Sequence, residues 1–166
     1  CEPENRFTNR MQHELYCAGH LTEAAVAYYK ATGKDKFLRL MQKYMDYIEK
    51  VFIIEDSASF NTPGHEEIEL ALVKLYDCTG EKKYLDMSRH FVDTRGTSKK
   101  DEDSPYYISQ AYDQTHMPVR EMKDATGHSV RAVYLYCAMA DLALRLGDNS
   151  LLDACKRLFK SIADKQ

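Results

Sequence analysis

The sequence YDQTHMPVREMKDATGHSVRAVYLYCAMADL, from Tyr112 to Leu142, places a polar segment directly before a nearly all-apolar helical pattern. A helix that is apolar on all sides is buried on all sides, so residues at its first turn lie at the mouth of a core. The N-terminal end of a helix also offers unpaired N–H groups and a partial positive charge, which suit hydroxyl groups and anions as ligands. We therefore expect a functional site at the junction formed by Gly127 and His128.

The rest of the chain shows helical periodicity and almost no strand signals. Apolar residues recur at steps of three and four, and glycine turns end several of the segments. The expected helices span Met11–Ala31, Lys36–Phe52, His65–Asp77, Lys82–Thr94, His128–Leu146 and Ser150–Ala163. The pattern predicts an all-α protein, and the length predicts one domain, residues 1–166.

A repeated turn divides these helices into three pairs. Tyr29–Leu38 (YKATGKDKFL) matches Tyr76–Leu85 (YDCTGEKKYL), and Leu144–Leu152 (LRLGDNSLL) follows loosely. Each repeat reads as an αα-hairpin with a glycine turn. The first helix of each pair is apolar or rich in small residues and the second is amphipathic, so the first helices should form an inner ring. We expect stacked αα-hairpins that form part of an α/α six-hairpin toroid.

An open α-solenoid is the alternative, because it also stacks helix pairs. Solenoid arrays keep a steady period, whereas Gly33, Gly80 and Gly147 are unequally spaced. The connections between the hairpins are also long and polar, as the rims of active sites are. Both features favour the toroid.

Composition excludes several kinds of partner. The net charge is -3 and no basic stripe with interleaved aromatic residues occurs, which argues against nucleic acid. Arg131, Asp141 and Arg145 interrupt the longest apolar stretch, Val130–Leu146, so no membrane span is expected. The five cysteines lie without CxxC spacing, which is typical of reduced thiols in a core rather than of disulfides or a metal site.

Three histidines occupy equivalent places in this scheme. His13, His65 and His128 each stand near the start of an expected inner helix. Inner helices that run parallel bring these histidines together at one end of the ring. Neutral imidazoles can hydrogen-bond sugar hydroxyls, and a three-histidine metal site is the alternative. No HExxH motif accompanies them.

Acidic residues follow two of the histidines. The helix dipole alone explains Glu14, Glu66 and Glu67, because carboxylates are stabilised in a first helical turn. A glycosidase usually needs two carboxylates that flank the scissile bond, or one carboxylate and another nucleophile. No convincing pair occurs, so we assign no catalytic residue to this chain and expect the catalytic machinery elsewhere.

For several other polar and aromatic residues, a structural role is the alternative to a role in the site. Arg120 and Glu121 are expected to form a buried ion pair, with ligand contacts as the alternative. His116, next to Pro118, belongs either to the rim or to the core. Three tyrosines are expected to line the mouth of the site, Tyr106, Tyr107 and Tyr112. The tyrosines on helices are expected in the core, namely Tyr28, Tyr44, Tyr47, Tyr134 and Tyr136.

Three motifs in order resemble the N-terminal half of the catalytic domain of glycoside hydrolase family 127, the β-L-arabinofuranosidases. They are HELYCAGHLTEAAVAYYKATG, PGHEEIELALVKLYDCTGEKKYLD and HMPVREMKDATGHSVRAVYLYCAMADLA, and the resemblance extends from Met11 to Leu146. Residues Ile53–Thr62 and the charged loop Thr97–Ser104 are not distinctive of the family, so the resemblance says nothing about rim contacts there.

The resemblance implies an α/α six-hairpin toroid that releases β-L-arabinofuranose with retention. It implies a cysteine nucleophile on Zn²⁺ held by cysteines and a glutamate, and a second glutamate as acid/base, all at positions after this region. The family histidines that contact the sugar correspond to His13, His65 and His128. The chain's own cysteines do not match the zinc motif, so we assign no metal ligand.

The sequence therefore predicts a fragment of a zinc-dependent glycosidase that carries the sugar-binding histidines. A non-catalytic helical scaffold that binds a carbohydrate or a protein is the alternative. A half-ring would expose apolar faces, so we expect association with the remainder of the toroid or with a second copy as a homodimer. Reduced cysteines favour a cytoplasmic location, with the periplasm as the alternative.

Overall fold

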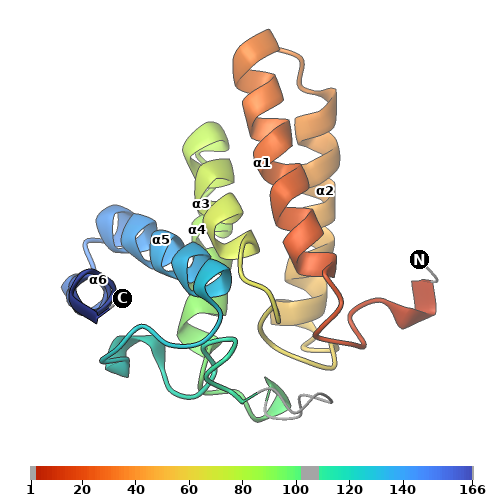
Figure 1. Cartoon of the computed structure of the whole chain (residues 1–166). Coiled ribbons are helices and arrows are strands. Elements are labelled where there is room, and N and C mark those ends of the chain that lie inside the picture. Colours follow the sequence, from red (N-terminus) through yellow and green to blue (C-terminus); the bar gives the residue numbers. More distant parts are fainter. Residues whose placement is uncertain (1–2, 102–108, 166) are drawn as a thin grey trace.

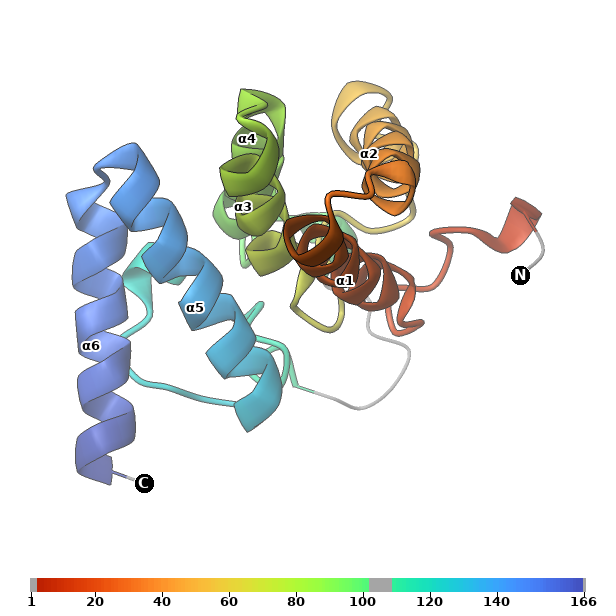
Figure 2. The same ribbon diagram turned by 90° about the horizontal axis from the view of Figure 1, so that it is seen from above.

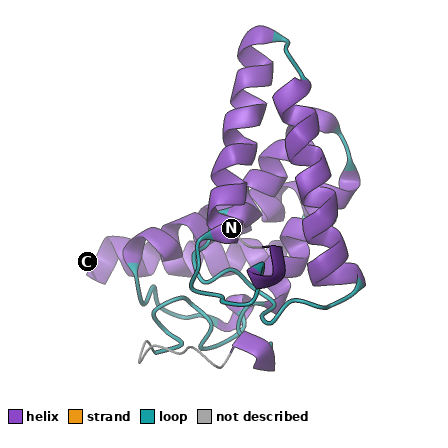
Figure 3. Ribbon diagram, turned by 90° about the vertical axis from the view of Figure 1, so that its right-hand side faces the viewer, coloured by secondary structure: helices purple, strands orange, loops and turns teal. Residues whose placement is uncertain are grey.

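The computed structural model describes residues 3–101 and 109–165, which are helical with connecting loops and contain no strand (Figures 1 and 3). The α-helices are α1 (Glu14–Thr32), α2 (Lys36–Glu49), α3 (Ile68–Thr79), α4 (Lys82–Thr94), α5 (Ser129–Leu146) and α6 (Asn149–Lys165). A π-helical turn, η2 (Lys50–Ile54), extends α2, and short 3₁₀ turns span Pro3–Asn5, Lys99–Asp101 and Val119–Glu121. The all-α prediction is confirmed.

The three glycine turns are also confirmed. Gly33, Gly80 and Gly147 end α1, α3 and α5 with φ of 70°, 75° and 65°. Nothing lies within 4 Å of a Cβ built at these positions, so space is not the reason for glycine. The left-handed backbone is the reason, because it lets the N–H of each glycine close the helix end without steric strain.

The helices form two layers, as seen from above in Figure 2. Helix α3 packs between α1 and α5, while α2, α4 and α6 pack against α1, α3 and α5 respectively. The loops that lead into α1, α3 and α5 lie at one end of the molecule, opposite the turn between α1 and α2 (Figure 1). This order agrees with the predicted inner and outer layers.

The hydrophobic core has two parts. One part joins α1, α2, α3 and α4 around Met45, Ile48 and Leu72, and the other joins α3, α4, α5 and α6 around Leu135 and Leu142. Tyr76 packs against both parts, so α3 links the two. This central position of α3 fixes the segment immediately before it, which carries His65.

Two helices begin later than expected, α1 at Glu14 rather than Met11 and α3 at Ile68 rather than His65. Before α3, arginine side chains hydrogen-bond the backbone carbonyls of residues 62–64. Arg10 reaches the carbonyl of Thr62 at 2.9 Å, Arg95 reaches Pro63 at 3.0 Å, and Arg131 donates to Gly64. These carbonyls are therefore held in a loop instead of accepting helical N–H groups.

Several apolar side chains expected in the core are exposed. On the inner helices, Leu21, Tyr28, Val130, Val133 and Leu144 are more than two-fifths exposed, and on α6 Phe159 is 73% exposed. Helix α5 is therefore not buried on all sides, which corrects the prediction from its apolar sequence. The periodicity of apolar residues predicted where the helices lie, but it did not predict which of their apolar faces are covered by other helices.

The cysteine prediction is partly wrong. Cys17 and Cys137 are exposed and so are not core residues, whereas Cys78 and Cys155 are half-buried and pack against the core. Cys1 lies outside the described residues. None of the described helices is long and apolar enough to cross a membrane.

Candidate functional site

The three predicted histidines lie together. His13 precedes α1, His65 lies three residues before α3, and His128 precedes α5. The ring centroids of His13 and His65 are 5.5 Å apart, and those of His65 and His128 are 6.3 Å apart. The N-terminal ends of the inner helices therefore bring the imidazoles to one place, as the repeat predicted.

Tyrosine rings surround this histidine group. Tyr16 lies 4.2 Å from His65 between ring centroids, Tyr134 lies 6.4 Å from His65, and Tyr112 lies 5.4 Å from His128. Tyr112 was predicted at the mouth of the site, and its position agrees. Tyr134 was predicted in the core, which is wrong, because its half-buried ring faces the histidines. Tyr106 and Tyr107 lie outside the described residues.

Burial keeps His65 neutral. Burial is the largest cause that lowers its pKa to about 4; a backbone hydrogen bond opposes this, and the charges of Arg131, His13 and His128 add to it. The Nδ1 atom lies 3.2 Å from the backbone carbonyl of Glu66, and because a carbonyl can only accept, Nδ1 must carry the proton. Nε2 then presents a lone pair, which suits a ligand hydroxyl.

His128 and Arg131 complete this side of the site. The Nδ1 atom of His128 is buried and has no hydrogen-bond partner among the described residues. Arg131 places its guanidinium 4.8 Å from the centroid of Tyr112 while it donates to the carbonyl of Gly64. The arginine therefore ties the loop that carries His65 to the start of α5 and orients the tyrosine.

The two carboxylates beside His65 do not belong to the first turn of α3. Glu66 and Glu67 precede α3 and are fully buried, which corrects the prediction that they occupy its first turn. Arg95, also fully buried, contacts Glu66 and Glu69 at 3.0 Å each. Burial raises the pKa of Glu66 to about 8 although Arg95 opposes the shift. These contacts of Arg95, together with its hydrogen bond to the carbonyl of Pro63, hold the loop that carries His65.

The predicted ion pair between Arg120 and Glu121 is wrong. Arg120 instead pairs with Asp93 on α4 and with Asp148 at 2.8 Å before α6. Glu121 is exposed. The guanidinium of Arg120 therefore joins α4 to the turn between α5 and α6. Its role is structural, as predicted, but its partners differ from the predicted one. His116 is half-buried, and burial lowers its pKa.

The charged loop after α4 contacts the segment that precedes His65. Asp101 is 3% exposed and accepts hydrogen bonds from the backbone of Asn61 at 2.8 Å and from the hydroxyl of Thr62 at 2.8 Å. Arg10 reaches Asp101 at 3.6 Å. The described part of this loop is therefore anchored to the segment that precedes His65.

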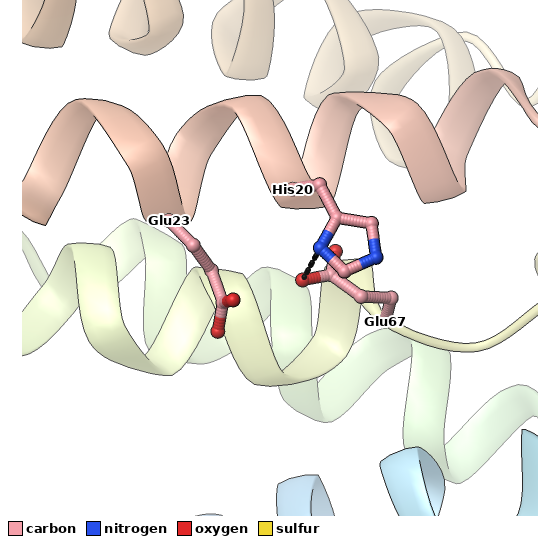
Figure 4. A group of neighbouring side chains, drawn as sticks. All are labelled: His20, Glu23 and Glu67. Atoms are coloured by element: carbon pink, nitrogen blue, oxygen red, sulfur yellow. Dashed lines mark ion pairs between the residues drawn. The ribbon is translucent and has the colours of Figure 1, made fainter. Parts of the chain in front are cut away.

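A second polar group lies beside the histidines and was not predicted. His20 and Glu23 on α1 face Glu67, with His20 Nδ1 3.4 Å from Glu67 Oε1 (Figure 4). His13, Tyr16, His20 and Glu23 follow one another at steps of three and four, which places them on one face of α1. That spacing was the signal in the sequence.

The zinc ligands that the family resemblance implies lie after this region, and the described cysteines do not form a metal site of their own. Within residues 3–101 and 109–165, the group of potential ligands close enough for a metal is His20, Glu23 and Glu67, without a cysteine. We therefore derive no chemical step through zinc. What the arrangement offers is hydrogen-bonding imidazoles and aromatic faces, which suit binding of a polyhydroxylated ligand.

A family model, the Beta-L-arabinofuranosidase, GH127 catalytic domain, matches residues 1–166. The chain belongs to this family. Its resemblance to glycoside hydrolase family 127, inferred from three motifs, is thereby confirmed.

Known GH127 proteins are similar in both sequence and structure. The non-reducing end β-L-arabinofuranosidase of Bifidobacterium longum subsp. longum is 37% identical over 95% of this chain and 26% of its own length. The crystal structure of a GH127 β-L-arabinofuranosidase from Geobacillus stearothermophilus T6 is 47% identical, with a TM-score of 0.92 over 99% of this chain and 28% of that one. A solved GH127 β-arabinofuranosidase is 44% identical, with a TM-score of 0.83 over 93% of this chain and 23% of that one.

This GH127 chain thus spans about a quarter of the length of the relatives it matches. The agreement with the G. stearothermophilus structure extends over nearly the whole chain, so stacked αα-hairpins belonging to an α/α barrel are the correct description of its fold.

Proposed function

We propose that the full-length protein is a glycosidase that releases β-L-arabinofuranose from the non-reducing end of arabinose-containing glycans. The observation that carries the proposal is the meeting of His13, His65 and His128, from three separate hairpins, within a ring of tyrosines. A neutral imidazole both donates and accepts, so it pairs with a sugar hydroxyl in either direction. Membership of the GH127 family supports arabinofuranose as that sugar.

The roles within the site follow from the contacts. His65 lies at the centre, between His13 and His128, so it reaches the hydroxyls of a sugar held between the two. Tyr16 and Tyr134 supply ring faces against which the apolar C–H face of a sugar packs. In this proposal the chain binds and orients the sugar, while bond cleavage uses groups not among its described residues.

A hydrolysis assay tests this function. The full-length protein is incubated with an aryl β-L-arabinofuranoside, and release of the phenol is followed. Release, with the α-L-arabinofuranoside as the control substrate that is not cleaved, is the expected result. Saturable binding of arabinose without release would favour the alternative, a non-catalytic carbohydrate-binding scaffold.

The same proposal covers the zinc ion and the part of the protein that packs against α1 and α5. We infer that the full-length protein holds Zn²⁺ through residues other than the described cysteines, which are dispersed and partly exposed. We also infer that the remainder of a helical ring covers Leu21, Val130 and Val133, which are about half exposed on α1 and α5. A homodimer is the alternative cover, and sedimentation of the full-length protein distinguishes the two. The cytoplasmic location stays a prediction.

A further inference from the structure

The group of His20, Glu23 and Glu67 has the geometry of a small cation site. One nitrogen or oxygen atom from each residue lies within 4.8 Å of the other two. Figure 4 shows His20 and Glu23 reaching from α1 toward Glu67, which stands just before α3. The three side chains converge from two elements, so an ion between them would join α1 to the loop that carries His65.

Gly19 makes room for this group. A Cβ built at Gly19 would lie 1.5 Å from Glu67 Oε2, so the carboxylate occupies space that any other residue would fill. Gly19 is buried inside α1, where glycine costs about 1 kcal/mol relative to alanine. The chain therefore accepts a less stable helix at the position that admits the Glu67 carboxylate.

Glu67 lacks a full set of partners among the described residues. Its side chain is 0% exposed, and neither carboxylate oxygen has a hydrogen-bond donor within the described residues. His20 Nδ1 lies 3.4 Å from Glu67 Oε1 and pairs with it only when protonated. Burial, together with the nearby Glu23 carboxyl, raises the pKa of Glu67 to about 9. A buried carboxylate without compensation is costly, so it takes up either a proton or a cation.

Lys74 compensates only one of the two carboxylates in this group, that of Glu23. Its ammonium donates to Glu23 Oε1 and forms an ion pair with that residue. No direct contact joins Lys74 to Glu67. Glu23 keeps a second oxygen, and Glu67 keeps two, so acceptor atoms remain after Lys74 is counted.

We propose that His20, Glu23 and Glu67 bind one divalent transition-metal ion of the Zn²⁺ class. One imidazole nitrogen and two carboxylate oxygens are a usual ligand set for such an ion, with water at the remaining position. An imidazole ligand disfavours Mg²⁺ and Ca²⁺, which take oxygen ligands. The site is distinct from the histidine group, and it stands independently of the proposed glycosidase activity.

The metal would act on the sugar site through Tyr16. The ring centroid of Tyr16 is 4.4 Å from that of His20 and 4.2 Å from that of His65. A metal ion that holds His20 in place would therefore also hold the Tyr16 ring against His65. In this role His20 and Glu67 are positioning residues, because neither is placed in the histidine group itself.

Zinc titration of the full-length protein tests the proposal. The protein is stripped with a chelator, dialysed, and titrated with Zn²⁺ by calorimetry, in wild type and in Glu67→Gln. Glutamine keeps the size of the side chain and removes its ability to act as an anionic ligand. We expect the variant to bind one equivalent less than wild type, or to bind that equivalent at least about 10-fold more weakly. Zinc bound at other sites is the same in both proteins, so it does not affect the difference in the number of equivalents bound.

Three further variants sharpen the result. Glu81→Gln removes an exposed carboxylate that bonds Gln42, and it should leave zinc uptake unchanged. Lys74→Met removes the competitor of the metal at Glu23, and it should tighten binding. His20→Gln should lose the same equivalent as Glu67→Gln, and it replaces that variant if Glu67→Gln fails to fold. Equal uptake by wild type, Glu67→Gln and His20→Gln would overturn the proposal and leave a proton on Glu67 as the compensation.

Discussion

The carboxylate of Glu67 lies where the side chain of Gly19 would be: a Cβ at Gly19 would come within 1.5 Å of Glu67 Oε2 and 3.0 Å of the backbone of Ile68. This contact joins the middle of α1 to the start of α3. It also sets the position of the loop that carries His65, since Glu67 follows His65 by two residues.

Substitution of Gly19 by alanine should destabilise the protein. Alanine gains about 1 kcal/mol of helix propensity, but forcing a methyl group into occupied space costs about 1–3 kcal/mol, and the backbone of Ile68 cannot move as a side-chain end can. We expect a net loss of up to about 2 kcal/mol in the free energy of unfolding, measured by urea denaturation. In a Glu67→Ala background the loss should shrink. An increase in stability for Gly19→Ala alone would contradict this packing.

Loss of the Arg95 charge should lower the free energy of unfolding more than Gly19→Ala does. Arg95→Met leaves Glu69 buried without its counter-ion, and breaking a buried ion pair from one side costs about 3–5 kcal/mol. Chemical denaturation measures the difference from wild type. The matched control is Lys82→Met, which removes an exposed pair with Asp86 on the same helix and should cost less than about 0.5 kcal/mol. Similar effects for both variants would be inconsistent with the buried pair.

Stability should depend on the titration of His65. Its pKa falls from the ordinary 6.5 to about 4 in the folded protein, so between these values the unfolded chain binds more protons. The contribution of His65 is therefore complete above pH 6.5 and is lost as the pH falls toward 4. An NMR titration, with the His65 signal identified by its loss in His65→Gln, should give a midpoint near 4. A midpoint near 6.5 would contradict the lowered pKa of His65.

The thiols should differ in reactivity. Cys155 is half-buried, and burial raises its pKa to about 11, so at neutral pH it has about 100-fold less thiolate than a thiol with the usual value of 9. Cys17 is exposed on α1. Limited alkylation with iodoacetamide, followed by peptide mass spectrometry, should label Cys17 well before Cys155. The reverse order would contradict the placement of α6 against α5.

The hairpin order and the histidine group were predictable from sequence because they depend on local rules. A positive φ requires glycine, so the turns at Gly33, Gly80 and Gly147 mark the helix ends directly. Once the first helices of the hairpins are taken as parallel neighbours, equivalent positions such as His13 and His128 must meet.

The contacts of Tyr134, Arg120 and Glu67 were not predictable in the same way. Each depends on the rotation of a helix or on the path of a loop between elements far apart in the chain. Arg120 pairs with residues 27 and 28 positions away, and Glu67 falls outside α3 because arginines hold the preceding carbonyls. Such partners follow from tertiary packing, which helical periodicity does not encode.

The most direct test of the proposed sugar site is the activity of His65→Ala in the full-length protein. We expect kcat/KM for a β-L-arabinofuranoside to fall by the equivalent of about 1–3 kcal/mol, the cost of leaving a sugar hydroxyl unpaired, with an unchanged unfolding midpoint at pH 7. The control is His90→Ala on α4, whose ring contacts Phe91 rather than the histidine group. Activity of His65→Ala equal to that of wild type would remove the central histidine from the site and contradict the proposed function of the group.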